Sequence, residues 1–198
     1  MRIETTESSI KLIDYRKDEG LWAVRWDFKP KMDESGNPTG LNWYEEDVFN
    51  YPPTIEDIQR VITEWFNKQT DAVVEHGFVW KGIRVLLNNE NKFNYKAIRD
   101  EARDREADIK QWDKEHPELA GMDMNGYEPT GRPKSLLPVT LKLGESNVPE
   151  NFYTFNTLNE LKDFFSAGVE HLQGAYGLGW YKIATFDWSP YVQALQEL

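Results

Sequence analysis

The sequence predicts an α+β fold, in which small antiparallel sheets or hairpins pack with about three main helices. Residues 22–28 alternate between large apolar side chains and smaller or polar ones, the period of two that is typical of a strand with one buried face. Residues 54–65 and 157–165 instead carry apolar side chains at helical spacing, each behind a threonine suited to cap a helix. Strands and helices in one chain favour a fold whose sheets and helices bury each other's apolar faces.

The composition narrows the classes of partner. The chain has 198 residues, 39% of them hydrophobic and 14% aromatic, which suffices for a core rich in rings without metal or disulfide staples. A formal net charge of −11 disfavours nucleic acid and membrane surfaces as partners, because both are negatively charged. Cysteine is absent, which excludes thiolate chemistry. The first residues contain no apolar signal segment, so we expect synthesis in the cytoplasm without an export signal.

The strands are predicted from alternation and from the turn residues between them. Two strands flank the polar turn RKDEG, and a hairpin is predicted around Lys81-Gly82, because glycine adopts the positive φ of tight turns. The predicted strand regions are residues 9–29 (two strands), 41–49, 77–87 (a hairpin), 136–144 and 151–155.

Two of the main helices are predicted to begin with a capping box, in which a threonine and an acid three residues later exchange hydrogen bonds. The boxes are Thr54 with Asp57 and Thr157 with Glu160. The first helix is expected to end near Ala72 and the second at the glycines of residues 174–180. A short C-terminal helix is predicted to begin at Ser189-Pro190. The two main helices share their apolar offsets, which we attribute to amphipathic helices in general rather than to duplication.

The third main helix follows the asparagine-rich residues 88–96. Asn91 or Asn94 is expected to cap it, and Pro117 to end it. Its apolar stripe is thin in the second half, where Ile109 and Trp112 are the members. We therefore expect the second half of this helix to project or to meet a partner.

Nothing in the sequence assembles a metal site or a catalytic group. His76, His116 and His171 lack a second ligand at helical metal-site spacing and are expected at surfaces or helix ends. Residues 32–40 and 123–128 resemble calcium loops but fail the order of ligands, so we interpret them as turns.

The acids of residues 45–47 form a cluster whose carboxyl separation the sequence does not define, and no nucleophile motif is present. We therefore predict a non-enzymatic protein without a cofactor.

Aromatic and asparagine side chains are the candidate binding residues. Exposed, roughly coplanar Trp and Tyr rings stack on sugars, whereas the more common role of such rings is to cover the ends of a core. The asparagines also have two alternative roles, as ligand contacts or as helix caps. The candidate ligand or partner contacts are Trp43, Tyr44, Asn91, Asn94, Trp112, Trp180 and Tyr181.

Five motifs resemble, in order, a family of uncharacterised domains from phages and prophages of gut bacteria, some of which occur beside tail-fibre proteins. The motifs are GFVWKG, LLNNENKFNYKA, LPVTLKLG, FNTLNELKDFFSAGVEHLQ and GW followed by DWS. The resemblance implies a non-enzymatic virion or tail-associated structural or protein-interaction module that is made in the host cytoplasm. Its partners would be virion components or a second copy. A carbohydrate-binding module for host attachment is the alternative, and a cell-wall hydrolase is a weaker one.

The resemblance also suggests how the chain is organised. Residues 1–75 would form an N-terminal unit of three strands and a helix, and residues 76–198 a family-like unit, both within one compact body. The family passes directly from the asparagine-rich helix to the next strand, so residues 104–135 are expected to be an insertion. This insertion includes the predicted loop 117–135, which is rich in glycine and proline.

Overall fold

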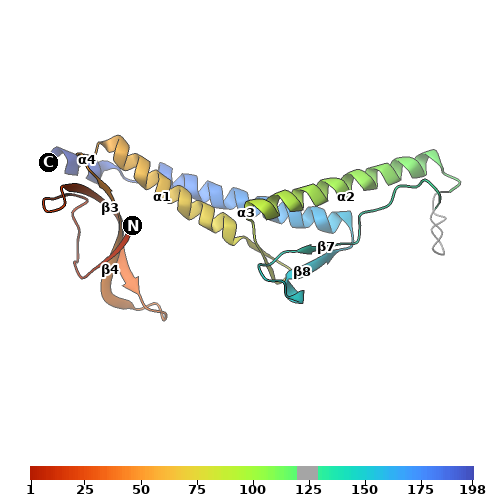
Figure 1. The fold of residues 1–198 in the computed structure, drawn as a ribbon, viewed down its shortest axis with the longest axis horizontal. Helices are drawn as coiled ribbons and strands as arrows, with labels where there is room; N and C mark the ends of the chain where they lie inside the picture. Colours follow the sequence, from red (N-terminus) through yellow and green to blue (C-terminus); the bar gives the residue numbers. More distant parts are fainter. Residues whose placement is uncertain (120–128) are drawn as a thin grey trace. The chain divides into compact units, whose positions relative to one another are not determined.

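The computed structural model describes residues 1–119 and 129–198 and confirms the α+β class (Figure 1). Segment 123–128, which resembles a calcium loop in sequence, lies outside the described residues, as does part of the predicted loop 117–135. Contacts divide the chain into two compact units. Unit 1 comprises Met1–Gln69 and Gly179–Leu198, and unit 2 comprises Thr70–Leu178.

The C-terminal residues therefore belong with the N-terminal unit, whereas the sequence analysis grouped them with residues 76–178. The reason lies in one buried side chain. Tyr191 is 4% exposed and joins the apolar core of unit 1, where its hydroxyl donates to the carbonyl oxygen of Arg25 at 2.9 Å.

Unit 1 is built on an antiparallel sheet with the strand order β1-β4-β3-β2. The strands are β1 (Arg2–Thr5), β2 (Ile13–Arg16), β3 (Leu21–Met32) and β4 (Pro38–Phe49). Strand β1 has no counterpart among the strands predicted from the sequence. The interpretation of residues 32–40 as a turn is confirmed for residues 33–37, whereas residue 32 ends β3 and residues 38–40 begin β4. In this turn the Asp33 carboxylate accepts hydrogen bonds from the N–H groups of Ser35 and Asn37 at 2.9 and 2.8 Å.

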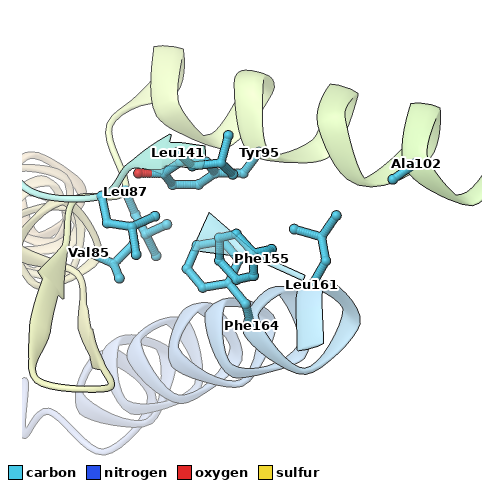
Figure 2. Packing of buried hydrophobic residues seen from close by; sticks show 9 residues of the cluster. Val85, Leu87, Tyr95, Ala102, Leu141, Phe155, Leu161 and Phe164 are labelled. Atoms are coloured by element: carbon cyan, nitrogen blue, oxygen red, sulfur yellow. The ribbon is translucent and has the colours of Figure 1, made fainter. Parts of the chain in front are cut away.

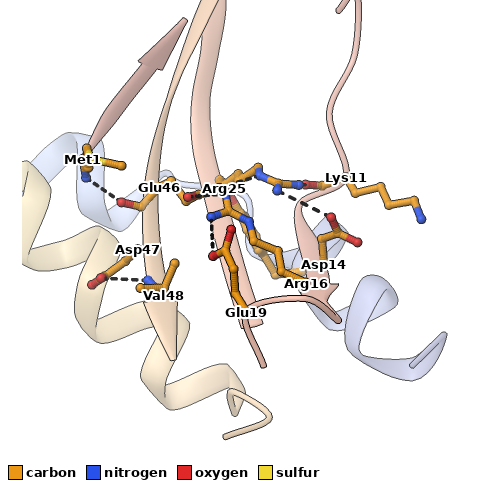
Figure 3. A network of polar contacts seen from close by, with 10 residues as sticks. Met1, Lys11, Asp14, Arg16, Glu19, Arg25, Glu46, Asp47 and Val48 are labelled. Atoms are coloured by element: carbon orange, nitrogen blue, oxygen red, sulfur yellow. Dashed lines mark hydrogen bonds and ion pairs between the residues drawn. The ribbon is translucent and has the colours of Figure 1, made fainter. Parts of the chain in front are cut away.

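Strand β3 is buried on both faces, which corrects the prediction of a single buried face. Val24 and Trp26 pack in the apolar core, but Ala23 and Arg25, on the opposite face, are 0% and 9% exposed. The carboxylate of Glu46, on neighbouring β4, accepts hydrogen bonds from the guanidinium groups of Arg25 at 2.8 Å and of Arg16 at 2.6 Å (Figure 3). The alternating pattern gave the wrong number of buried faces, because a charged side chain that forms an ion pair can be buried as fully as an apolar one.

Unit 1 also includes helical residues up to Gln69 and from Gly179 onward. Helix α1 (Ile55–His76) begins with the predicted capping box, since Thr54 Oγ1 accepts the N–H of Asp57 at 3.2 Å and Asp57 accepts the N–H of Thr54 at 3.1 Å. The helix runs four residues beyond the predicted end at Ala72, into unit 2, where Val74 is buried and Gly77 follows with φ +72°.

Helix α4 (Ser189–Gln196) confirms the predicted C-terminal helix but not its cap. Ser189 is its first residue rather than the N-cap, and the carboxylate of Asp187 accepts the N–H of Ser189 at 3.0 Å.

Unit 2 combines a hairpin, a second two-stranded sheet and helices. Strands β5 (Phe78–Trp80) and β6 (Ile83–Val85) form the predicted hairpin, and both Lys81 and Gly82 have positive φ, as a type I′ turn requires. The other elements are α2 (Asn89–Glu115), β7 (Val139–Lys142), the short 3₁₀ helix η1 (Pro149–Asn151), β8 (Phe152–Phe155) and α3 (Leu158–Ala184). Strands β7 and β8 pair antiparallel, as predicted.

Helix α3 begins with half of the predicted capping box. The N–H of Glu160 donates to Thr157 Oγ1 at 3.2 Å, but the Glu160 carboxylate accepts the N–H of Asn156, at 3.2 Å, rather than that of Thr157. Its predicted end is wrong, because the helix continues through residues 174–180 to Ala184. Gly174 and Gly177 lie inside it and border open space. An internal glycine costs a helix only about 1 kcal/mol, which the packing of the remaining turns offsets.

Helix α2 also begins earlier than predicted. Asn88 is the N-cap and accepts the N–H of Asn91 at 2.8 Å, so Asn91 and Asn94 lie within the helix and do not cap it. In the second half of α2 the returning chain covers part of the surface, since Arg132 binds the Asp113 carboxylate through two hydrogen bonds of 2.8 and 2.9 Å. A partner for this half stays a prediction.

The core of unit 2 is a cluster of aliphatic and aromatic side chains, and Figure 2 shows Tyr95, Phe155 and Phe164 among their aliphatic neighbours. Phe164 of α3 lies at its centre and is 2% exposed. The ring centroids of Phe155, Tyr95, Trp80 and Phe78 lie 5.0, 5.3, 5.5 and 5.8 Å from that of Phe164. This cluster holds α2, α3 and both small sheets of unit 2 around one centre.

Candidate binding groove

A polar groove lies within unit 2, along the first turns of α2 and the strand β7. Its volume is about 590 Å³. It contains both of the candidate asparagines from the sequence. The lining residues are Leu86, Asn88, Glu90, Asn91, Asn94, Tyr95, Ala97, Ile98, Thr140, Leu141, Lys142, Gly144 and Glu145.

Asparagines form the helix wall of this groove. Asn88, Asn91 and Asn94 are spaced by three residues, which places them near one face of α2. Asn88 is occupied as the helix cap, and Asn91 donates to the carbonyl oxygen of Leu86 at 3.2 Å. Asn94 is exposed, and its amide has no hydrogen-bond partner among the described residues. Asn94 therefore offers both a donor and an acceptor to a ligand.

Strand β7 forms the other wall and presents part of its backbone edge to α2. The hydroxyl of Tyr95 donates to the carbonyl oxygen of Lys142 at 3.1 Å, so this carbonyl points away from β8. Residues two apart on a strand direct their backbone groups to the same side. The N–H and C=O of Thr140 therefore also face the groove.

The side chains of β7 agree with this orientation. Thr140 pairs with Thr154 of β8, and their hydroxyl oxygens lie 2.8 Å apart. Such close side chains are typical of the non-hydrogen-bonded pairs of an antiparallel ladder, whose backbone groups point outward. No backbone group of another described element bonds to the backbone of Thr140.

Two hydrogen bonds link the chain segments that border the groove. The N–H of Leu86 donates to the carbonyl oxygen of Leu143 at 3.1 Å, beside the bond from Tyr95 to Lys142. Burial raises the pKa of Tyr95 to about 12, so its hydroxyl keeps its proton and donates at neutral pH. Glu90, Glu145 and Lys142 are the charged residues of the lining, which makes it weakly negative.

The remaining candidate residues lie elsewhere. Trp43 and Tyr44 are successive residues of β4, so their rings point to opposite faces of the sheet. The Arg2 guanidinium lies 4.5 Å from the ring centre of Trp43, whereas Tyr44 is 8% exposed and packs against Arg25. These two rings do not form a coplanar pair.

Trp180 and Tyr181 are 68% and 65% exposed on α3, but successive helix positions point about 100° apart. Trp112 stacks on His116 at 4.4 Å between ring centres. Asn91 and Asn94 are therefore the candidate contacts that the structure brings into one site.

The strand wall of this groove contains none of the candidate residues predicted from the sequence. Residues 136–144 are predicted as a strand, but which edge of it stays unpaired depends on the pairing with β8 and on Tyr95, far away in the sequence. The acids of residues 45–47 lie in unit 1, where Glu45 and Glu46 are each bound to arginine, at 2.8 Å from Arg2 and from Arg25.

Among the described residues no group of three His, Asp or Glu side chains could hold a metal ion. No helix in the same part of the chain is long and apolar enough to cross a membrane. Comparisons of the chain with protein-family models, with curated proteins and with solved structures found no match. The candidate site is therefore defined by its geometry alone.

Proposed function

We propose that the chain is a non-enzymatic protein-interaction module of a phage or prophage, and that its polar groove binds an extended segment of a protein partner. Two separate observations support the two parts of this proposal. The order of the sequence motifs supports the phage origin and a virion or tail-associated role. The groove supports the interaction.

The observation that carries the interaction is the unpaired edge of β7. Extended peptides add to such an edge as a further strand, and main-chain hydrogen bonds then supply affinity without demanding one particular sequence. The N–H and C=O of Thr140 would pair with the peptide, and the Asn94 amide on α2 would meet the peptide's other edge. The open part of the groove suits a short segment, because β7 has only four residues.

Replacing a single backbone donor tests the interaction. Peptides are selected on the whole chain from a library of short random sequences, and their affinities are measured for Thr140→Pro and Thr140→Val. Proline removes the N–H that faces the groove and leaves the bonds to β8 in place, whereas valine loses the same hydroxyl but keeps the N–H. We expect a loss of about tenfold for proline and little change for valine.

Hydrogen exchange supplies an independent measurement. Bound peptide should slow exchange of the Thr140 amide in the unmodified chain. Selected peptides that bind Thr140→Pro as tightly as Thr140→Val, or that leave the Thr140 amide unprotected, would show that the β7 edge is not the site.

The virion association has its own test. Antibodies against this chain should label purified particles of the phage that encodes it, and particles without this chain provide the control. Absence of label from intact and gently opened particles would overturn the association and leave the peptide interaction unaffected.

A carbohydrate-binding role is the second candidate, favoured by the exposure of Trp180 and Tyr181. Under this alternative, a glycan array would give signals that disappear with Trp180→Ala and persist with Asn94→Ala. Glycan binding that depends on Asn94 instead would assign the sugar to the polar groove.

A further inference from the structure

A second hollow in unit 2 lies between α2 and α3 and differs in character from the polar groove. It has a volume of about 200 Å³ and almost entirely apolar walls. Phe164 and Phe165 of α3 line it together with Tyr95 of α2 and Phe78 of β5 (Figure 2 shows Tyr95 and Phe164). We call it the apolar pocket. An apolar cavity of about 150 Å³ already holds a benzene molecule, so this pocket has room for a small apolar group.

The charged side chains that line the apolar pocket are all basic. Lys92 and Lys96 are the charged residues of its lining, and they lie one helical turn apart on α2. Lys96 pairs with Asp100 at 2.9 Å. The half-buried Lys92 forms no ion pair and no side-chain hydrogen bond with any described residue. In a chain of net charge −11, this leaves a cation beside an apolar hollow whose lining contains no carboxylate.

The next turn of α2 extends the basic rim. The Arg99 guanidinium lies 3.8 Å from the ring centre of Phe165, a lining residue of the apolar pocket. Its charge is partly balanced by Asp100, to which Arg99 donates at 2.6 Å. Of the three cations along this face, Lys92 is therefore the one left to bind an external anion.

We propose that the apolar pocket binds a small anionic amphiphile, with its short alkyl chain between α2 and α3 and its carboxylate at Lys92. Burial of an alkyl chain among rings supplies affinity, and a charge-assisted hydrogen bond to the ammonium fixes the orientation. The volume selects a short single chain over a lipid with two chains. Tyr95 lines both hollows, but Thr140 and Asn94, the groups that the peptide would engage, do not line the apolar pocket.

The charge requirement is tested with octanoate and with octan-1-ol, which carries the same chain without the carboxylate. Calorimetric titration of the whole chain should show octanoate binding about tenfold tighter than the alcohol. Lys92→Gln should remove this advantage without changing the affinity for octan-1-ol. Lys162→Gln, which replaces an exposed lysine of α3 outside the pocket, should leave both affinities unchanged.

The location is tested with two glycines of α3. A Cβ at Gly168 would lie 3.4 Å from the Phe78 ring, an ordinary contact, so Gly168→Ala narrows the pocket without forcing the fold apart. A Cβ at Gly174 meets nothing within 4 Å. Both changes favour a helix, so both variants should be at least as stable as the unmodified chain. Only Gly168→Ala should weaken the binding of octanoate and of octan-1-ol, each by several-fold.

Three results would overturn this assignment. One is octanoate and octan-1-ol binding equally, which would make the pocket a purely apolar site. Another is Gly168→Ala binding octanoate as tightly as Gly174→Ala, which would locate the ligand elsewhere. The third is no measurable binding of octanoate by a folded chain. None of these results bears on the Thr140→Pro experiment, so the two proposals fail separately.

Discussion

The two units bury different chemistry behind similar secondary structure. Among the described residues, the buried charged side chains are Arg25, Glu45 and Glu46, and all three belong to the sheet of unit 1. Unit 2 is organised around tilted and edge-on rings, with Phe164 at the centre. The sheet of unit 1 therefore covers one face with apolar side chains and the other with paired charges, whereas unit 2 has a single apolar centre.

This difference affects where ligands can bind. The arginines and glutamates of unit 1 satisfy one another across β3 and β4 (Figure 3). Unit 2 contains an unpaired strand edge, a free asparagine amide among the described residues and an ammonium without a described partner, around two hollows. The two candidate binding sites therefore both lie in unit 2.

The largest expected effect comes from disrupting the buried ion pairs of unit 1. Glu46→Gln removes the charge that Arg16 and Arg25 share, and leaves two guanidinium groups beside a neutral amide with its own donor. Removing one partner of a buried ion pair costs about 3–5 kcal/mol, and we expect a loss in that range from urea unfolding. The control is Glu19→Gln, an exposed partner of the same Arg16, for which the loss should stay below about 1 kcal/mol. Equal losses would mean that burial of the pair contributes nothing.

A smaller effect is expected when the ring cluster of unit 2 is trimmed. Phe155 is fully buried, but leucine keeps most of its apolar volume, so Phe155→Leu should cost about 1–2 kcal/mol. Phe152→Leu, on the same strand but 40% exposed, should change the free energy of unfolding by less than about 0.5 kcal/mol. A loss for Phe155→Leu as large as that for Glu46→Gln would remove the distinction between the two cores.

The same contrast explains how far the sequence alone could predict the fold. Local signals were sufficient where a few neighbouring residues decide the outcome. Thr54 with Asp57, Thr157 with Glu160 and Lys81-Gly82 all form the predicted caps and turn. They succeed because each hydrogen bond or positive φ lies within four residues of the signal.

Predictions failed where distant packing decides. Residues 174–180 resemble a helix end, yet α3 continues through its glycines to Ala184. Arg25 resembles a surface residue in an alternating strand, but Glu46 buries it. The groove shows both cases. Asn91 and Asn94 were identified as candidates from the sequence, whereas the open edge at Thr140 depends on β8 and Tyr95.

The smallest expected effect is the change in the free energy of unfolding with pH that the carboxylates of the two helix caps, Glu160 and Asp57, produce. Hydrogen bonds from Lys81 and then from Tyr153 hold the pKa of Glu160 at about 2, below its ordinary value of 4.5. Lys81 Nζ lies 2.6 Å from the Glu160 carboxylate. A lowered carboxyl pKa means that the folded state binds protons less readily than the unfolded chain. The stabilisation is therefore complete above about pH 4.5 and is lost as the pH falls towards 2.

Glu160→Gln should remove this dependence. At neutral pH the variant should be less stable than the unmodified chain by less than about 1 kcal/mol, the range for solvent-exposed ion pairs. The difference should shrink as the solution is acidified, because protonated Glu160 and glutamine are both neutral.

In unit 1 the pKa of Asp57 is also lowered, first by the hydrogen bond from the Thr54 backbone, so Asp57→Asn should show the same sign. Lys81→Met distinguishes the two caps. It should reduce the loss of stability on acidification that depends on Glu160, and it should leave the loss that depends on Asp57 unchanged. If Lys81→Met alters neither response, the cap alone lowers the pKa of Glu160, and the boxes of the two units are equivalent.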